Sequence, residues 1–169
     1  MGIPPSDVGV LVVNGHDRAQ DLRRDVRDTL VGWGKWLRVL LPLMRPFIRA
    51  VDYQAYRDFI IPAIAFYQNP DRDWLFYDAP CAFYFYGCGA CDPADPVIAA
   101  TYAMLAAESL GLGSCMLGFP GYAFTYSRKL RKRWSLPKRA QLGLMVVVGH
   151  PAVTHRRGVR RRFARVVQG

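Results

Sequence analysis

Residues 95–115, DPVIAATYAMLAAESLGLGSC, continue into residues 116–121, MLGFPG, and together they decide the fold of this chain. Small and apolar residues recur at helical spacing up to residue 109, which predicts a buried helix with alanines that let another backbone approach closely. The positions expected on its core face are Ile98, Tyr102, Leu105 and Ser109. Gly111 and Gly113 supply conformations that residues with a Cβ resist. We therefore expect the helix to end in a backbone-lined bend suited to a flat ligand.

Working outward, residues 141–148, QLGLMVVV, are the most apolar run of the chain. Such a run predicts a central strand that is buried on both faces of a sheet. We also expect strands at 8–13 and 80–86, and helices at 17–40, 53–61 and 122–134. Pro42 and Pro46 are expected to break or kink the first helix, and Pro62 and Pro137 to close the other two. The order of these elements predicts a sheet and helices that share one core.

Composition limits the class of protein. The chain has 169 residues, of which 51% are hydrophobic and 13% aromatic, so we expect one globular domain over residues 1–169 and exclude a disordered tail. Its beginning, MGIPPSDVG, lacks a basic and apolar leader, which favours a cytoplasmic location. Charges and prolines interrupt the longest apolar region, residues 30–48, so no transmembrane helix is expected.

Charge is distributed unevenly along the chain. Residues 1–120 hold ten Lys and Arg against thirteen acidic residues, whereas residues 121–169 hold thirteen Lys and Arg and no acid. This asymmetry predicts an anionic partner for the C-terminal third. The arginines of residues 156–165 either form a solvated tail or grip a phosphate group. Nucleic acid is disfavoured because Phe163 is the only aromatic residue among them that could stack on bases.

Side-chain chemistry is sparse. Cys88 and Cys91 have the spacing of a metal or redox pair, but one pair supplies only two ligands, so we interpret them as structural cysteines and leave both other functions open. The sequence contains neither a phosphate loop nor a nucleophile elbow. We therefore assign no catalytic side chain and no metal ligand.

Residues 95–119 resemble the flavin-dependent nitroreductase family, whose members carry an Asp, an Ala-rich helix, LGLG and a Ser/Thr-Cys in this order. Residues 130–151, LRKRWSLPKRAQLGLMVVVGHP, resemble its leucine-proline, strand and Gly-Tyr-Pro segment, with His150 in place of tyrosine. Residues 76–87, FYDAPCAFYFYG, resemble its Ala-Pro and strand element. The long middle helices and the arginine-rich ending are most similar to the branch associated with ferredoxin-type iron–sulfur domains.

This resemblance implies an α+β fold, in which a mixed sheet is flanked by helices, and an intertwined homodimer with FMN at the subunit interface. The cofactor-binding positions that it implies are Pro5 and Ser6 beside the ribityl chain, Ser114, Met116, Leu117 and Gly118 along the flavin ring, and Arg161 and Arg162 at the phosphate. The family's N-terminal Arg-x-Ser-x-Arg segment is missing from this sequence, which suggests a truncated start. Residues 7–10, DVGV, replace the Asn and Gln that usually follow the Pro-Ser loop.

The resemblance implies an FMN-dependent oxidoreductase that reduces nitroaromatic, quinone-like or other electrophilic small molecules by a ping-pong mechanism, with NAD(P)H or a ferredoxin-type protein as electron donor. The alternative is a degenerate family member with weak or no flavin binding, which acts as an interaction protein through its basic C-terminal third. A peripheral membrane protein is a third possibility, based on residues 30–49. Aromatic residues of the middle helices either fill the core or wall the substrate side: Trp33, Trp36, Tyr53, Tyr56 and Phe59.

Overall fold

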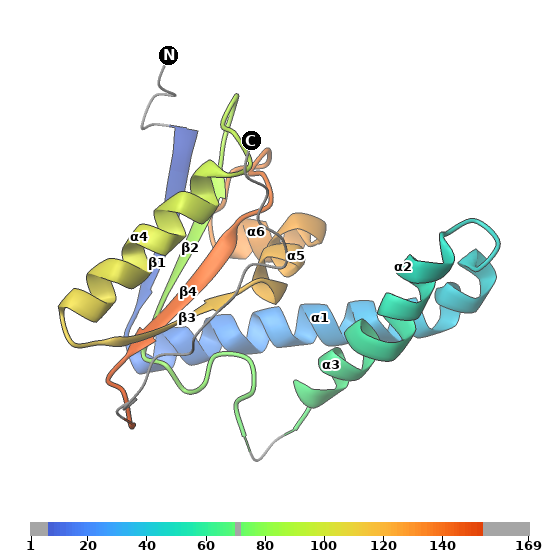
Figure 1. Cartoon of the computed structure of the whole chain (residues 1–169), viewed down its shortest axis with the longest axis horizontal. Helices are drawn as coiled ribbons and strands as arrows, with labels where there is room; N and C mark the ends of the chain where they lie inside the picture. Colours follow the sequence, from blue (N-terminus) through green and yellow to red (C-terminus); the bar gives the residue numbers. More distant parts are fainter. Residues whose placement is uncertain (1–6, 70–71, 154–169) are drawn as a thin grey trace, which may run out of the picture.

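The computed structural model describes residues 7–69 and 72–153 of the chain. Four strands form one sheet in the order β1-β2-β4-β3, and helices lie on both of its faces (Figure 1). The strands are β1 (Val8–Asn14), β2 (Cys81–Gly87), β3 (Gly113–Leu117) and β4 (Leu144–Gly149). The helices are α1 (His16–Met44), α2 (Ala50–Ala55), the π-helical turn η2 (Tyr56–Ile60), α3 (Ile61–Phe66), α4 (Asp95–Ser109), α5 (Phe119–Tyr126) and α6 (Arg128–Arg133). The predicted α+β fold class is confirmed, and the pairings of these four strands are all antiparallel.

β4 lies inside the sheet, as its apolar sequence predicts. Met145 and the three valines after it are all buried, and the strand pairs with β2 on one side and with β3 on the other. The strand begins at Leu144 and not at the predicted Gln141. Gln141 is held elsewhere, because its N–H donates to the Gly87 carbonyl at 2.9 Å and its amide donates to the Gly89 carbonyl at 3.3 Å.

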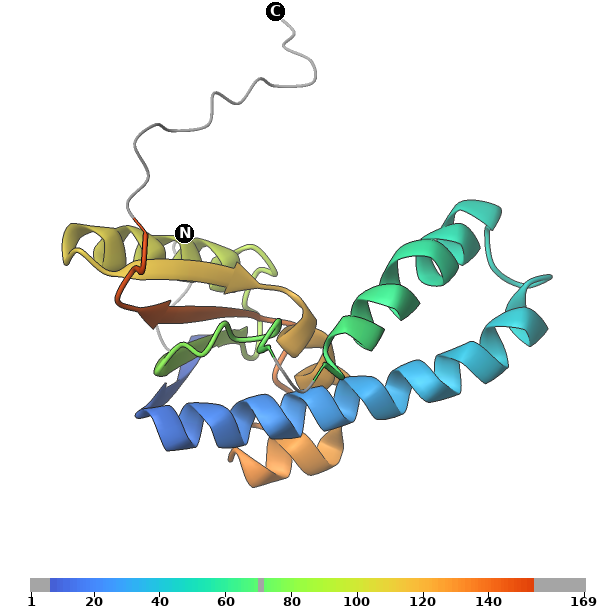
Figure 2. The ribbon, with the colours of Figure 1, turned by 90° about the horizontal axis from the view of Figure 1, so that it is seen from below.

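The helices form one layer on each face of the sheet. Figure 2 shows α4 on one face and α1 on the other. α1 buries Leu22, Val26 and Leu30 against the sheet, as predicted. Leu40 was also expected on this face but is exposed, whereas Leu41 is buried. The partner of the helix changes along its length: at Gly34 it packs on Ile64 of α3, so a different side of the helix is covered there.

The middle helices form an arm that folds back along the C-terminal half of α1 and projects beyond the sheet (Figures 1 and 2). The prediction that a helix ends near Pro62 was wrong. The helical run continues from α2 through η2 into α3, and Pro62 lies just after the π-helical turn. Within η2, the Ile61 N–H donates to the Tyr56 carbonyl, five residues back. No helix among the described residues combines the length and the apolar character needed to cross a membrane.

Two apolar clusters fill the spaces between the layers. The larger lies between the sheet and the layer of α1, α5 and α6, and it includes Val13, Leu22, Phe76, Tyr84, Phe124 and Met145. The smaller lies under α4 and contains the buried residues Ala100, Ala107, Val146 and Val148. The sheet is therefore covered on both faces, which explains why β4 has no polar side.

α4 has the predicted bounds but the opposite orientation. Its expected core face is exposed, with Ile98 at 51%, Tyr102 at 69% and Leu105 at 62% of full accessibility. Ala100 and Ala107 instead contact the sheet. Small side chains let the helix approach the strands closely, and this excludes the bulkier residues from the contact.

The glycines after α4 differ in their functions. Gly111 has φ +71° and ends the helix in a Schellman motif: its N–H donates to Glu108, and the Leu112 N–H donates to the Ala107 carbonyl at 2.9 Å. Gly113 has no such conformation and begins β3. The bend expected over residues 111–118 is therefore only a tight turn at Gly111, and the following residues are a strand.

The basic helix predicted over residues 122–134 is in fact two helices. α5 begins at Phe119, and α6 begins after Ser127. The Ser127 backbone is extended, and its hydroxyl accepts from the Leu130 N–H at 3.2 Å, as an N-cap does. This cap starts a new helix where the apolar periodicity of α5 ends.

Candidate functional site

Four of the predicted site residues lie together on β3 and at its junction with α5: Ser114, Met116, Leu117 and Gly118. β3 is an edge strand of the described sheet, so every second backbone N–H group points away from β4. Met116 packs with the cluster under α4, and Leu117 packs with the cluster on the α1 side. A flat molecule that lies along this edge therefore contacts the backbone of β3. The side chains of Met116 and Leu117 on either side of that backbone are held in place by the core.

Gly118 is the most informative of these residues. Its φ of −83° and ψ of −38° suit any amino acid, and a Cβ built there meets no atom within 4 Å. Neither strain nor packing within the described chain therefore requires glycine. Among the described residues, its N–H has no hydrogen-bond acceptor. Gly118 also precedes α5, whose N-terminus carries partial positive charge. Open space beside a free N–H is what the close approach of an electron-rich ring requires.

An aromatic pair that the sequence analysis missed stands beside this junction. Tyr67 follows α3, and its ring meets the ring of Phe119 edge to face, with centroids 5.6 Å apart. Burial raises the pKa of Tyr67 to about 12, so its hydroxyl stays protonated at neutral pH. The aromatic density of residues 66–77 is visible in the sequence, but only the return of α3 to α5 brings Tyr67 to this place.

Ser114 lines a cavity of about 260 Å³ at the opposite end of β3 from Gly118. The other walls are the C-terminal part of β4, the residues just after it and the loop before β2, and they include Asp78, Pro80 and His150. Ser114 and Gly118 are four residues apart, which corresponds to about 13 Å along a strand. Ser114 and Gly118 therefore mark two ends of one edge, and they do not converge on one atom of a ligand.

A buried carboxylate shapes the loop that lines this cavity. Asp73 accepts the N–H groups of Leu75 and Phe76, both at 2.9 Å, and of Asp78 at 3.0 Å. Tyr77 and Asp78 both have φ +56°, a conformation that costs a non-glycine residue of the order of 1 kcal/mol. The three hydrogen bonds to Asp73 hold the chain in this turn.

The remaining predicted site residues lie outside the described part of the chain. These are Pro5 and Ser6 before β1, and Arg161 and Arg162 after β4. Asp7, which the sequence places beside the Pro-Ser loop, is described: its carbonyl accepts the Cys88 N–H at 2.7 Å. The backbone of Asp7 is thus tied to the loop after β2.

Cys88 and Cys91 form a turn in that loop, and both are free thiols. Burial and the Asp95 carboxylate, 3.5 Å from Sγ, raise the pKa of the Cys91 thiol. A raised pKa keeps the thiol protonated, and this disfavours the redox-pair interpretation. Within residues 7–69 and 72–153, no three His, Cys, Asp or Glu side chains gather as metal ligands do.

The aromatic residues of the middle helices do not form one wall. Trp33 stacks on Tyr126 of α5 with ring centroids 5.8 Å apart. Trp36 is exposed on the C-terminal half of α1, and Phe59 is exposed on the arm. Trp33 therefore packs in the interior, whereas the described chain covers neither Trp36 nor Phe59.

The model of the nitroreductase family matches residues 56–150, more than half of the chain, and includes β2, α4, β3, α5, α6 and β4. No curated protein matches the sequence.

Solved structures share the fold at low sequence identity. A nitroreductase with bound FMN from Bacteroides fragilis is 14% identical, with a TM-score of 0.65 over 99% of this chain and 80% of that one. An FMN-dependent nitroreductase from Clostridium difficile is 18% identical, with a TM-score of 0.58 over 98% and 81%. A nitroreductase with bound FMN from Desulfitobacterium hafniense is 20% identical, with a TM-score of 0.57 over 93% and 73%. On the family match and this shared fold, the chain belongs to the nitroreductase family.

Proposed function

We propose that this protein is an FMN-dependent oxidoreductase of the nitroreductase type. The observation that carries the proposal is Gly118, a glycine that the described protein itself does not need, with a free N–H between an edge strand and the N-terminus of α5. FMN, when bound, supplies the hydride chemistry. The protein then needs to orient the ring, exclude water and stabilise negative charge, and no acid–base side chain is required.

Main-chain groups at the end of β3 supply that stabilisation in our proposal. The N–H group of Gly118 lies where the dipole of α5 adds to it. Fixed donors that face developing negative charge contribute about 3–4 kcal/mol each to a reaction barrier in other enzymes. Ser114 and Met116 would then border the ring, Pro5 and Ser6 the ribityl chain, and Arg161 and Arg162 the phosphate.

The donor is NAD(P)H or a ferredoxin-type protein, and the acceptor is a nitroaromatic, quinone-like or other electrophilic small molecule. Both use the same face of the ring in turn, so the reaction follows ping-pong kinetics. The Tyr67–Phe119 pair beside the end of β3 suits a planar aromatic acceptor. Assays of each donor with a nitroaromatic and with a quinone acceptor identify the electron donor and the preferred acceptor.

We further propose that the active form is a homodimer. The outer face of α4 exposes Ile98, Tyr102 and Leu105. The C-terminal half of α1 exposes Trp36, and the turn after it exposes Phe47. Apolar residues grouped in this way mark an interaction surface. A second copy of this chain is the occupant that fits the family.

The decisive experiment is FMN binding by the Gly118→Ala variant. The added methyl group enters open space, so the fold is expected to keep its thermal stability to within about 0.5 kcal/mol. The same methyl group would occupy the place of the ring, and FMN affinity is expected to fall by tenfold or more, about 1.4 kcal/mol.

Gly32→Ala is the matched control, because a Cβ there also meets no atom within 4 Å but the residue lies on α1. It should leave FMN affinity unchanged, as followed by quenching of flavin fluorescence. Equal FMN affinity in wild-type protein and Gly118→Ala would show that FMN does not bind beside Gly118. A wild-type protein that is colourless and takes up no added FMN would support the interaction-protein alternative.

A further inference from the structure

A second feature of the molecule is the concentration of cations on α6. Its sequence is RKLRKR, and Leu130 is the only residue of the helix that enters the core. The five cations divide between two sides. On one side, Arg133 Nε lies 2.7 Å from Asp25 Oδ2, and Lys129 lines the same hollow as Asp25 and Asp28 of α1. Acidic residues therefore compensate this side.

The other side of α6 has no such compensation. Its cations are Arg128, Arg131 and Lys132, which share a face because they stand three and four residues apart. In the described chain none of the three has an acidic group within 4 Å. Outside the described residues, Asp71 is the only acid of the sequence.

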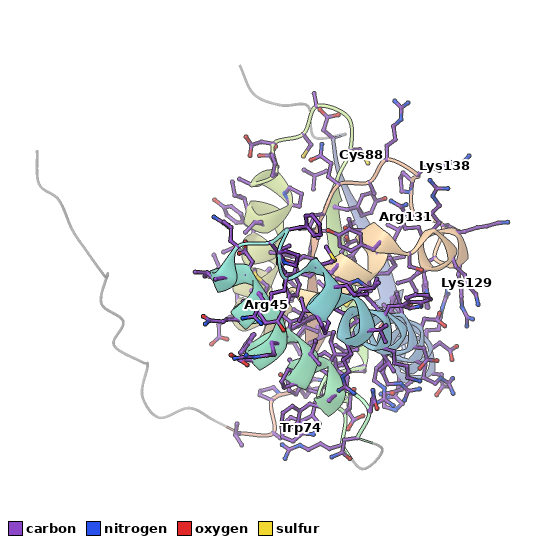
Figure 3. All side chains as sticks on the ribbon, turned by 90° about the vertical axis from the view of Figure 1, so that its right-hand side faces the viewer. Arg45, Trp74, Cys88, Lys129, Arg131 and Lys138 are labelled. Carbon is purple, nitrogen blue, oxygen red and sulfur yellow. The ribbon has the colours of Figure 1, made fainter. Side chains whose placement is uncertain are left out.

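A sharp turn brings a fourth cation to the same place. Ser135 has φ +55°, and the Leu136 N–H reaches back to the Arg131 carbonyl at 2.8 Å. The chain therefore reverses, and Lys138 returns to the side of α6; Figure 3 shows Arg131 and Lys138 as neighbours.

These residues surround a hollow of about 680 Å³, lined by Arg128, Arg131, Lys132, Ser135, Leu136 and Lys138. The volume lies in the range of small-molecule sites, about 300–1,000 Å³. Leu136 is mostly buried and gives the hollow an apolar contact, and Ser135 adds a hydroxyl.

We propose that this hollow binds the diphosphate group of a small phosphorylated ligand, such as a nucleoside diphosphate. In the described part of the chain none of these four cations has an ion-pair partner. Around one concave space they repel one another, and a multiply charged anion relieves this repulsion. Guanidinium groups match phosphate oxygens two at a time, and lysines add point charges. A diphosphate, with more charge than a monophosphate, fits four cations best. The hollow shares no residue with β3, so the proposal does not depend on flavin binding.

The test is calorimetric titration of the full chain with inorganic pyrophosphate and with ADP, at about 50 and about 200 mM salt. The Arg131→Gln/Lys138→Gln variant removes two cations from the hollow. The control, Lys129→Gln/Arg139→Gln, removes the same charges from residues that do not line it. We expect wild type to bind both ligands more tightly at low salt. The affinity of Arg131→Gln/Lys138→Gln should be at least about tenfold lower, and the affinity of the control should change less than twofold. Tighter binding of ADP than of pyrophosphate would indicate a nucleotide, and equal binding would indicate recognition of the diphosphate alone.

Several results would overturn the proposal. These are absence of pyrophosphate binding, equal weakening by the two double variants, competition of FMN with pyrophosphate, and binding of nucleic acid or an acidic protein without binding of pyrophosphate. Circular dichroism checks that each variant is folded. If Arg131→Gln impairs folding, the exposed Lys138→Gln alone should weaken pyrophosphate binding about threefold or more, and no weakening would count against the site.

Discussion

Replacing Tyr84 by phenylalanine removes one hydroxyl from the centre of the larger core cluster. The Tyr84 side chain is 2% exposed, and its oxygen accepts the N–H of buried Gly143 at 3.2 Å. The Tyr84→Phe variant leaves this N–H without a partner, which costs about 1–3 kcal/mol of unfolding free energy at neutral pH. The stacking of the ring on Phe124, with centroids 4.5 Å apart, is retained.

The same residue makes stability depend on alkaline pH. Burial raises the pKa of Tyr84 from 10.0 to about 12 in the folded protein. Above pH 10 an unfolded chain loses this proton first, so the contribution of Tyr84 is complete below pH 10 and is lost as the pH rises toward 12. A pKa difference of two units between the folded and unfolded states corresponds to about 2.7 kcal/mol of unfolding free energy. The advantage of wild type over Tyr84→Phe should therefore fall by roughly that amount between pH 9 and pH 12, so that it disappears or reverses.

Urea unfolding followed by circular dichroism at a series of pH values measures both effects. Tyr126→Phe is the matched control: Tyr126 is 68% exposed, and its ring still stacks on Trp33 after the change. The control should follow wild type at each pH. A difference between wild type and Tyr84→Phe that stays constant from pH 9 to pH 12 would refute the argument that burial of this hydroxyl governs its ionisation.

Two further predictions concern α6 and the outer face of α4. Asp25 accepts from the Trp134 indole at 2.9 Å and pairs with Arg133, so Asp25→Ala should lower the unfolding free energy by about 1–3 kcal/mol. Asp28→Ala, which removes an exposed carboxylate, should change the unfolding free energy by less than about 0.5 kcal/mol in the same urea titration. Equal losses of unfolding free energy in Asp25→Ala and Asp28→Ala would contradict the role of Asp25. Tyr102→Asp should convert the proposed homodimer to single chains in sedimentation velocity, whereas Tyr102→Phe should not. A wild-type protein that sediments as one chain would exclude the dimer.

The sequence predicted the elements whose signals are local. Leu144 to Val148 are apolar at every position, so this segment is stable only between two layers, and it is the interior strand of the sheet. The bounds of α4 followed from the proline at its start and from Gly111, which has the left-handed conformation of a C-terminal cap. Family membership followed from the order of these same segments.

Tertiary contacts decided the rest. Both sides of α4 are apolar, so periodicity alone could not show that its alanines would contact the sheet and that Tyr102 would remain outside. Residues 113–117 became a strand because β4 offered an unpaired edge, and their own sequence does not specify that pairing.

The candidate site shows the same division. A glycine followed by a helix is visible at Gly118, but only the folded chain shows that its N–H is free and that the space beside it is open. The cations of α6 are likewise evident from the sequence. Their separation into a side compensated by Asp25 and a side that borders an uncompensated hollow depends on where α1 lies, because charges distant in the chain interact only through the fold.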